Sequence, residues 1–223
     1  MNGTSMTTVM DEEQVKSKRY FYLTIKRLFD IIVSGISLIL LSPLFLIIGI
    51  MIKMDSKGKV IFKQKRIGKH GEPIYIYKFR TMIPNAEEVL EKMLKENPDI
   101  YEEYTTNKKL KNDPRVTKFG NILRKTSLDE LPQLLNILNG DMSIVGPRPV
   151  IDSEIEKYGD LKEYFLSVIP GLTGWWACNG RSCTSYDERK RLELYYIQHR
   201  GIMLDLKIIF KTFTSVLKRD GAK

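Results

Sequence analysis

Residues 124–149 read RKTSLDELPQLLNILNGDMSIVGPRP, and this stretch decides how the rest of the chain is interpreted. An adjacent carboxylate pair, Asp129-Glu130, stands near its start, and Arg148 stands between two prolines at its end. Carboxylates at one end and a fixed cation at the other suit a substrate that carries phosphate and a metal ion. Between the two ends, leucines recur at helical spacing and predict an apolar face that is buried. These are Leu131, Leu134, Leu135 and Leu138.

The acidic pair has a second interpretation as a helix cap. Ser127 and Glu130 have the spacing of a capping box, and acidic side chains are expected in a first helical turn in any case. Pro132 would then stand inside the helix, so a helix start nearer Leu131 is easier on the backbone. With that start, both carboxylates lie at a helix mouth whose N–H groups also attract phosphate. The sequence leaves both interpretations open.

Motifs along most of the chain resemble those of the bacterial sugar transferases that are monotopic phosphoglycosyl transferases. Each motif alone is weak, whereas the series, in one order over about residues 24–219, is specific. Within residues 124–149 the motifs are Ser-Leu-Asp-Glu-Leu-Pro-Gln-Leu, Asn-Gly-Asp-Met-Ser and Val-Gly-Pro-Arg-Pro. Outside it they are Lys26-Arg27-Leu28-Phe29-Asp30, Tyr77-Lys78-Phe79-Arg80-Thr81-Met82, Asp113-Pro114-Arg115-Val116-Thr117, Pro170-Gly171-Leu172-Thr173-Gly174-Trp175 and Asn179-Gly180-Arg181.

The charge balance points to an anionic partner. The 223 residues carry a net charge of +9, which suits anionic lipid, a phosphate-bearing substrate or nucleic acid. The basic residues are not interleaved with aromatic residues as in nucleic-acid modules, so nucleic-acid binding is not expected. Cys178 and Cys183, with only two histidines in the chain, provide neither a disulfide framework nor a good zinc site. A reduced, cytoplasmic environment is the default.

An uncharged run from Ile31 to Ile52 predicts a membrane segment. As a straight helix it would extend about 33 Å, and it is too long for a cleavable signal peptide. Its length alone favours a single-spanning anchor. Basic clusters on both sides argue against that, because a span would place one cluster on the wrong face of the membrane. Before the run these are Lys18, Arg19, Lys26 and Arg27, and after it Lys53, Lys57, Lys59, Lys63, Lys65 and Arg66.

Ser42 and Pro43 near the middle of this run predict a bend. Pro43 removes a backbone hydrogen bond and forces Ser42 out of the helical region, while the Ser42 hydroxyl can satisfy a freed backbone group. A helix that enters, turns and returns keeps both basic flanks on the cytoplasmic side. The family resemblance implies such a re-entrant helix.

The predicted fold class is α+β, mostly helical, with a short β-hairpin and a re-entrant membrane helix broken at Ser42-Pro43. The hairpin strands are expected at 60–65 and 74–82, and helices at 85–96, 121–124, 153–166, after Ser185 and at 204–217. Residues 170–181 are expected to form a Gly- and Trp-rich loop. The predicted organisation is a flexible tail (1–17), an interfacial segment with the re-entrant helix (18–56) and a cytoplasmic, membrane-associated catalytic domain (57–223).

The resemblance implies transfer of a sugar-1-phosphate from a UDP-sugar to polyprenyl (undecaprenyl) phosphate, with release of UMP. Asp129 is the expected nucleophile, in a route through a phosphosugar-aspartyl intermediate, and Glu130 is the expected second catalytic residue and Mg²⁺ ligand. Arg124 matches a family arginine that contacts phosphate. Further substrate-binding roles are expected for Arg148, Arg181, Lys78 and Arg80. Structural salt bridges remain the alternative for Arg148 and Arg181.

Glu193 stands where the family usually has aspartate, and it is a second expected metal ligand. The extra methylene leaves its metal role open, and Trp176-Ala177-Cys178 also departs from the commoner pattern. The expected location is the cytoplasmic face of the bacterial inner membrane, as a monotopic protein that contacts lipid. The sequence leaves open whether the protein forms a homo-oligomer. The alternatives are a membrane-anchored scaffold without enzymatic activity, and an enzyme that makes the diphosphate link without a covalent intermediate. The identity of the sugar and the glycan pathway are not encoded in any recognisable motif.

Overall fold

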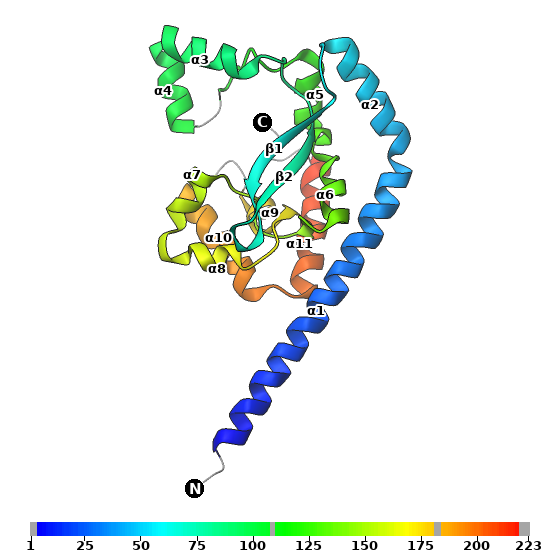
Figure 1. Ribbon diagram of the computed structural model, residues 1–223, viewed down its shortest axis with the longest axis vertical. Helices are drawn as coiled ribbons and strands as arrows, with labels where there is room; N and C mark the ends of the chain where they lie inside the picture. The colour runs from blue at the N-terminus through cyan, green and yellow to red at the C-terminus, as the bar shows by residue number, and fades with distance from the viewer. Residues whose placement is uncertain (1–3, 108–109, 181–183, 219–223) are drawn as a thin grey trace. The chain divides into compact units, whose positions relative to one another are not determined.

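The computed structural model describes residues 4–107, 110–180 and 184–218 (Figure 1). They form two compact units, each built from separate segments of the chain. Unit 1 comprises the described residues within 1–39, 65–75 and 134–221, and unit 2 those within 40–64 and 76–133. Both units combine helices with short strands, so the predicted α+β class is confirmed. Each unit joins segments that are distant in sequence, and the predicted division at 17/18 and 56/57 stays a prediction.

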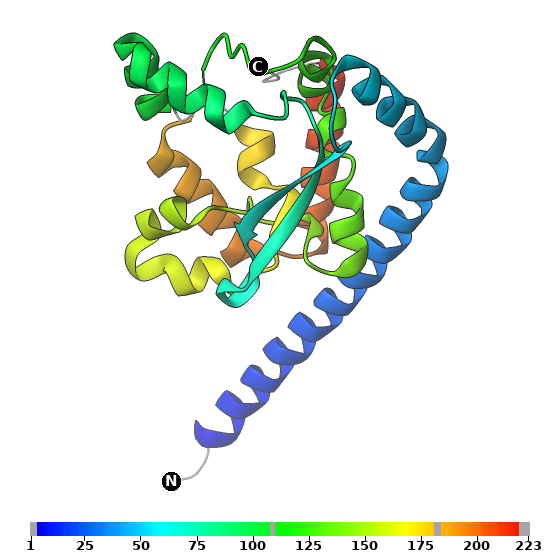
Figure 2. The same cartoon turned by 45° about the horizontal axis from the view of Figure 1, so that its top comes forward.

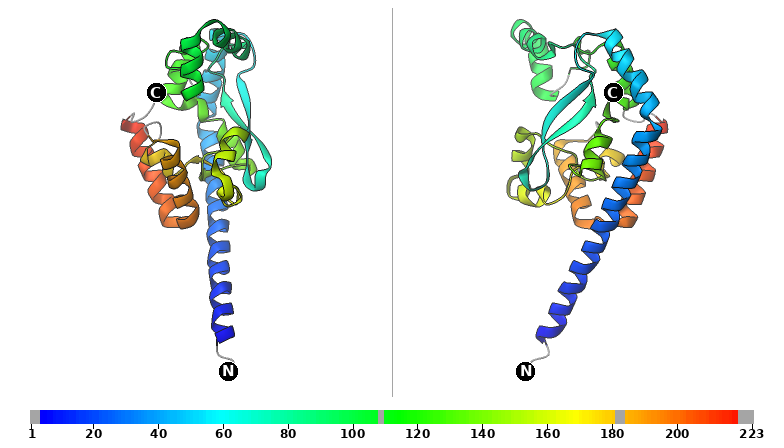
Figure 3. Two further views of the ribbon diagram at one scale, coloured as in Figure 1. Left: turned by 90° about the vertical axis from the view of Figure 1, so that its left-hand side faces the viewer. Right: turned by 45° about the vertical axis from the view of Figure 1, so that its right-hand side comes forward.

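Two consecutive helices, separated by Leu41, make up residues 4–55. Helix α1 spans Thr4–Leu40 and α2 spans Ser42–Asp55 (Figure 3). Leu41 is the N-cap of α2, and the Ser42-Pro43 pair lies in its first turn. A proline in a first turn costs no hydrogen bond, since that N–H has no helical partner. The break therefore lies where Ser42-Pro43 predicted it. Residues 4–17, expected as a tail, are helical, and no proline interrupts them.

Among the described residues, no single helix is long and apolar enough to cross a bilayer. The segments Arg19–Leu40 and Ser42–Asp55 meet that criterion together, as a bent pair. The bend agrees with the predicted break, and the re-entrant path through the membrane stays a prediction.

The motif Lys26-Arg27-Leu28-Phe29-Asp30 fastens α1 to the rest of unit 1. Arg27 donates to the carbonyl oxygens of Ile137 (2.6 Å) and Leu138 (2.8 Å), near the end of α6 (Gln133–Asn139). Asp30, which is buried, accepts from the backbone N–H of Ile144 at 2.9 Å. Each contact pairs a charge with a backbone group, so the motif works as a structural clamp.

The core of unit 1 is formed by residues from Val145 to Ile208. Strands β3 (Ser143–Val145) and β4 (Gly171–Thr173) pair in parallel, Ser143 with Gly171 and Val145 with Thr173. Helices α9 (Trp175–Asn179), α10 (Tyr186–His199) and α11 (Ile202–Lys218) complete the unit. Residues expected as a loop at 170–181 thus include a strand and a helix. Buried members of the core include Val150, Ile155, Tyr196 and Ile208.

The helix expected at 153–166 is divided into short pieces. They are α7 (Asp152–Ile155), the 3₁₀ helix η3 (Glu156–Leu161) and α8 (Lys162–Leu166). Gly159, with φ 52°, turns the chain into the left-handed region and interrupts the helix. By contrast, the N-cap at Ser185 is confirmed: its side chain accepts from the N–H of Glu188 and opens α10.

A hairpin passes through both units, with β1 at Ile61–Ile67 and β2 at Pro73–Phe79 around the short 3₁₀ helix η1 (Lys69–Gly71) (Figure 2). The predicted hairpin is therefore confirmed. Unit 2 adds α3 (Ala86–Glu96), α4 (Pro98–Asn107) and α5 (Lys118–Thr126). Its core joins α2, β2 and α5 through Ile48, Ile52, Phe79 and Leu123.

Candidate active site

The Asp129-Glu130 pair lies on a single 3₁₀ turn, η2 (Leu128–Glu130), which follows α5 directly. Ser127 ends α5 in the left-handed conformation, with φ 56°, and its side chain makes no capping bond to η2. The capping-box interpretation is therefore wrong. Leu128 and Leu131, on either side of the carboxylates, pack against the core of unit 2 and fix the turn.

The prediction that the leucines at helical spacing form one buried apolar face is confirmed only in part. Leu134 is buried, whereas Leu135 is 41% exposed, and the two fully buried members of α6 are Asn136 and Ile137. The buried side of α6 therefore combines apolar and polar side chains and does not follow the leucine series; its members are Gln133, Leu134, Asn136 and Ile137.

Lys78 of β2 forms an ion pair with Glu130. The Nζ–Oε1 distance is 2.8 Å, and both side chains are largely shielded from solvent. The structure thus brings two of the predicted site residues together within unit 2. The ion pair directs the Glu130 carboxylate toward Lys78, and the charge of Lys78 lies next to Asp129.

Burial, and to a smaller extent the neighbouring Glu130 charge, raise the pKa of the Asp129 carboxyl to about 6. Lys78 and Arg124 act in the opposite direction and lower this pKa. At pH 7 the Asp129 side chain is therefore still mainly ionised, about ten to one. It combines the charge of a nucleophile with the partial burial that limits its solvation.

Arg124 is held beside the acidic pair by Thr81. Its Nε donates to Thr81 Oγ1 at 2.9 Å. Gly120 makes this approach possible, because a Cβ at that position would lie 2.1 Å from the carbonyl oxygen of Thr81. Thr81 and Gly120 were not among the predicted site residues. The available signals were the place of Thr81 in the motif at residues 77–82 and the spacing of Gly120 from Arg124, one helical turn.

Arg80 has a different set of partners. Its guanidinium donates to the carbonyl oxygens of Ile52 (3.4 Å), Ser56 (2.7 Å) and Lys57, all at or just after the end of α2. Cations stabilise this end of a helix, where carbonyl groups have no helical partner. The described contacts of Arg80 are those of a helix cap.

The other predicted site residues belong to unit 1. Glu193 on α10 is 1% exposed, and its Oε1 accepts from the backbone N–H of Arg148 at 3.1 Å. Its Oε2 is buried with no hydrogen-bond partner among the described residues. Burial raises the pKa of the Glu193 carboxyl to about 7, although the Arg148 N–H and the Arg189 charge lower it.

The Gly-Pro-Arg-Pro and Pro-Gly-Leu-Thr-Gly motifs approach each other closely. A Cβ on Gly146 would lie 2.6 Å from the carbonyl oxygen of Ile169, and one on Gly171 would lie 2.0 Å from the nitrogen of Gly146. Only glycine fits at both places. This backbone contact sets the position of Arg148, whose guanidinium lies 5.7 Å from the Trp176 ring centre.

Arg189 is a buried cation that the sequence reasoning missed. It lies one turn before Glu193 on α10, donates to Glu154 Oε1 at 3.2 Å and lies over the Trp176 ring at 4.7 Å. Its Nε and Nη2 have no partner among the described residues. The four-residue spacing from Glu193 was the available signal. Arg181, a predicted substrate-binding residue, lies outside the described residues.

The structure describes no group of three or more His, Cys, Asp or Glu side chains that could hold a metal ion by themselves. Mg²⁺ does not require one, because it is usually bound by one or two carboxylates together with water and substrate phosphates. The adjacent carboxylates of Asp129 and Glu130 fit that pattern. Glu193 is the other residue that was predicted to bind the metal, and its Oε2 has no hydrogen-bond partner among the described residues.

Comparison with known proteins gives one consistent result. The family model described as "Bacterial sugar transferase" matches residues 21–219. The chain is 46% identical to an exopolysaccharide production protein, ExoY, of Sinorhizobium fredii, over 88% of this chain and 87% of that protein. It is 45% identical to an undecaprenyl-phosphate galactose phosphotransferase of Salmonella typhimurium, over 89% of this chain but 41% of that protein.

A relative from Escherichia coli is named as a UDP-glucose:undecaprenyl-phosphate glucose-1-phosphate transferase. It is 38% identical over 95% of this chain and 43% of that protein. The chain thus spans less than half of these two longer relatives and nearly all of ExoY. With the family model covering most of its length, this chain belongs to the bacterial sugar transferase family and is an enzyme of the transferase class.

Proposed function

We propose that this chain transfers a sugar-1-phosphate from a UDP-sugar to polyprenyl phosphate, releasing UMP. One observation carries the proposal: the partly buried Asp129 carboxyl group lies next to a Glu130–Lys78 ion pair, with Arg124 nearby. The names of the Salmonella and Escherichia relatives, which describe this class of reaction, support it. Family membership disfavours the scaffold alternative.

In the first step, an Asp129 carboxylate oxygen attacks the phosphorus next to the sugar. The bond from that phosphorus to the bridging oxygen breaks, and UMP leaves with the oxygen and the electron pair. The product is a phosphosugar-aspartyl enzyme. An ionised carboxylate needs no base for this attack.

In the second step, a phosphate oxygen of polyprenyl phosphate attacks the same phosphorus. The bond between phosphorus and the Asp129 oxygen breaks, which restores the carboxylate and gives a polyprenyl-diphosphate-sugar. Neither step consumes or releases a proton when both phosphates are fully ionised. The role of the other residues is therefore to bind and neutralise charge.

Charge repulsion between Asp129 and the diphosphate is the main obstacle. Lys78 and Arg124 place two cations beside Asp129, and the arginine fork suits phosphate oxygens. Glu130 would hold Mg²⁺, which when bound neutralises phosphate charge. Arg148 and Arg181 are assigned to substrate binding, and Glu193 to a metal ion or to a hydrogen-bond donor of the substrate.

The reaction also sets the location. The acceptor phosphate lies at the level of the lipid headgroups and the nucleotide sugar is cytosolic, so we place the enzyme at the cytoplasmic face of the membrane. A re-entrant α1–α2 pair with basic flanks would hold it there.

The test is release of UMP from a panel of UDP-sugars by detergent-solubilised protein, with undecaprenyl phosphate and Mg²⁺. We expect release with one donor, loss without metal, and complete loss in Asp129→Asn. Trapping of a sugar-phosphate adduct on Asp129 by mass spectrometry would establish the covalent route. Reduced but persistent release in Asp129→Asn would instead favour direct transfer without a covalent intermediate.

A further inference from the structure

Residues 113–117 lead into α5, the helix that carries Arg124, and the reaction proposed above gives them no role. Their two charged side chains pair with each other: Arg115 Nε donates to Asp113 Oδ1 at 2.8 Å, and Nη2 donates to Oδ2 at 2.5 Å. Both side chains are 8% exposed. The backbone N–H of Arg115 also donates to Asp113 Oδ1, at 3.1 Å. A shielded ion pair with this two-pronged geometry holds the segment in one fixed turn.

This turn is joined to the residues that follow β2. The Ile83 N–H donates to the carbonyl oxygen of Arg115 at 2.9 Å. The Thr117 N–H donates to the carbonyl oxygen of Thr81 at 3.0 Å. Thr117 is also the N-cap of α5, since its side chain accepts from the Gly120 N–H at 2.9 Å. Thr117 therefore fixes both the start of α5 and its distance from Thr81.

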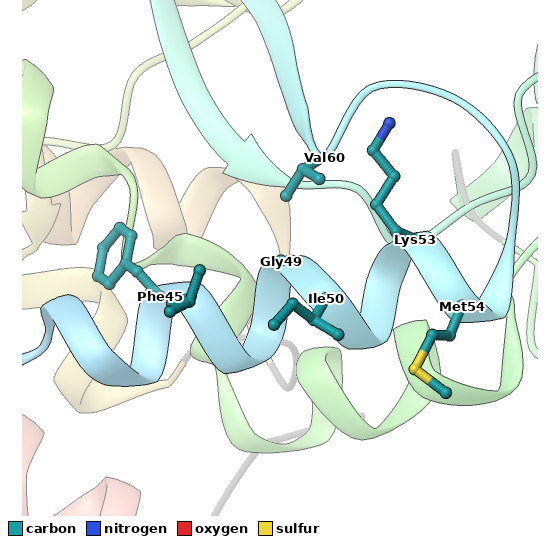
Figure 4. Close-up of a pocket in the computed structure, with 7 residues that line it drawn as sticks. Phe45, Gly49, Ile50, Lys53, Met54 and Val60 are labelled. Carbon is teal, nitrogen blue, oxygen red and sulfur yellow. The ribbon is translucent and has the colours of Figure 1, made fainter.

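The residues just before Thr81 are held by the core of unit 2. Phe79 is buried and packs against Phe45 of α2, with 5.2 Å between the ring centres. Phe45 and Val60 both line an apolar groove beside α2 (Figure 4). The carbonyl oxygen of Val60 accepts from the Arg80 N–H at 2.8 Å. Thr81, which is 8% exposed, thus lies on backbone that is fixed before and after it.

The hydroxyl of Thr81 is the hydrogen-bond partner of Arg124. Arg124 Nε donates to Thr81 Oγ1 at 2.9 Å, and in the described part of the chain Nη1 and Nη2 make no hydrogen bond. Arg124 is exposed and lies in the last turn of α5, where the charge of Asp129 acts on it. A hydrogen bond at Nε orients the guanidinium plane and leaves both terminal nitrogens for the oxygens of a phosphate.

Arg115 also removes a competitor for Arg124. The Asp113 carboxylate is close enough for its charge to act on Arg124. Its two oxygens are occupied by Arg115. Without Arg115, this carboxylate would be free to pair with Arg124 in place of a phosphate. The Asp113–Arg115 pair therefore keeps the Arg124 guanidinium available.

We propose that Thr81 and the Asp113–Arg115 pair are positioning residues for donor binding, which orient the Arg124 guanidinium toward the diphosphate and do not touch the substrate. The inference rests on the proposed function, in which Arg124 binds phosphate. It gives the buried turn at residues 113–117 a role in the affinity for the nucleotide, in addition to its role in the fold.

The experiment measures the Kd of UDP, the part that all donors in the panel share, for the full-length protein in detergent with Mg²⁺. Thr81→Val keeps the shape of the side chain and removes the hydroxyl. We expect the Kd to rise about tenfold, as for loss of one hydrogen bond to a charged group. Thr81→Ser restores the hydroxyl and should restore the affinity. The matched control is Thr126→Val, because the Thr126 hydroxyl bonds only to carbonyl oxygens of α5 itself.

Double variants distinguish positioning from a general effect on the fold. In an Arg124→Met background, Thr81→Val should leave the Kd unchanged, because the hydroxyl no longer has a guanidinium to orient. An equal rise in Kd with and without Arg124 would overturn the proposal, and so would an unchanged Kd for Thr81→Val in the presence of Arg124.

The Asp113–Arg115 pair has its own test. Arg115→Met frees the Asp113 carboxylate and should raise the Kd of UDP, and addition of Asp113→Asn should recover part of the loss. No recovery in the double variant would overturn the role of the pair. If Arg115→Met does not fold, the Thr81 variants decide the proposal by themselves.

The two proposals can fail separately. A Kd of UDP that depends on the Thr81 hydroxyl, without UMP release from any donor, would refute the proposed reaction and still support the positioning of Arg124. UMP release by the unmodified protein, with a Kd that does not respond to Thr81→Val, would do the reverse.

Discussion

The pKa of Asp129, about 6, makes donor chemistry sensitive to pH in a defined direction. Only the ionised carboxylate attacks phosphorus, so single-turnover UMP release should be half-maximal near pH 6. Below that point the rate should fall about tenfold per pH unit. Lys78→Met removes a cation that lowers this pKa, and we expect the midpoint to shift to higher pH. The measurement is the pH profile of the rate without acceptor.

Lys63→Met provides a matched control for Lys78→Met. Lys63 lies on the neighbouring strand, where its ammonium contacts the Tyr77 ring at 5.3 Å and does not pair with Glu130 in the described contacts. Its substitution should leave the midpoint unchanged. A midpoint that stayed constant or moved to lower pH in Lys78→Met would show that Lys78 does not act on Asp129.

At this scale the sequence was informative about which residues matter and less so about their partners. The spacing of Ser127 and Glu130 was compatible with a capping box, yet Glu130 pairs with Lys78, 52 residues earlier. Arg189 was missed, because a buried arginine on a helix rich in charged residues resembles any solvated arginine in sequence. Long-range pairing of charges depends on tertiary packing, which local patterns do not report.

Among the elements, α2 depends on Arg80 at its C-terminal end. Arg80→Ala should lower the free energy of unfolding by about 1–3 kcal/mol, since it leaves backbone carbonyls without their donor. We expect a lower apparent Tm in detergent with an unchanged KM for the UDP-sugar. Arg80→Lys keeps the charge without the fork and should recover part of the loss. An unchanged Tm together with a raised KM for the UDP-sugar would show instead that Arg80 binds the substrate.

The elements themselves were predicted where local signals were strong. The hairpin, the break at Ser42-Pro43 and the cap at Ser185 all depend on turn or capping chemistry within a few residues. The β3–β4 pair was missed because each strand is three residues long and its partner is distant in sequence. The interruption at Gly159 depends on a left-handed glycine inside an otherwise helical pattern.

For the whole molecule, the decisive prediction concerns membrane topology. Single cysteines at Arg19 and Lys59, in a background with Cys178 and Cys183 replaced by serine, report the two flanks of the α1–α2 pair. For a re-entrant pair we expect both to react with an impermeant maleimide from the cytoplasmic side only. Labelling of the two positions from opposite sides would establish a transmembrane path.

A straightened helix is the matched comparison for that experiment. Replacing Ser42 and Pro43 by alanine removes the cause of the break, so a fraction of the molecules should expose Lys59 on the other side.

At this scale the ordered series of motifs was sufficient to identify the family, whereas the division into two units was not foreseen. Interleaving of distant segments leaves no local mark in a sequence.

The side chain of Asp205 has a consequence for how the protein is made. Its carboxylate accepts from Tyr22 (2.9 Å), Lys26 (2.7 Å) and Tyr196 (2.8 Å), and so fastens α1 to α11. Tyr22 precedes Asp205 by 183 residues, which a ribosome adds in about 10–40 s. During that interval α1 exists without its anchor on α11. The bilayer, or any other partner that meets α1 as it emerges from the ribosome, therefore contacts α1 before Asp205 is available to bind it.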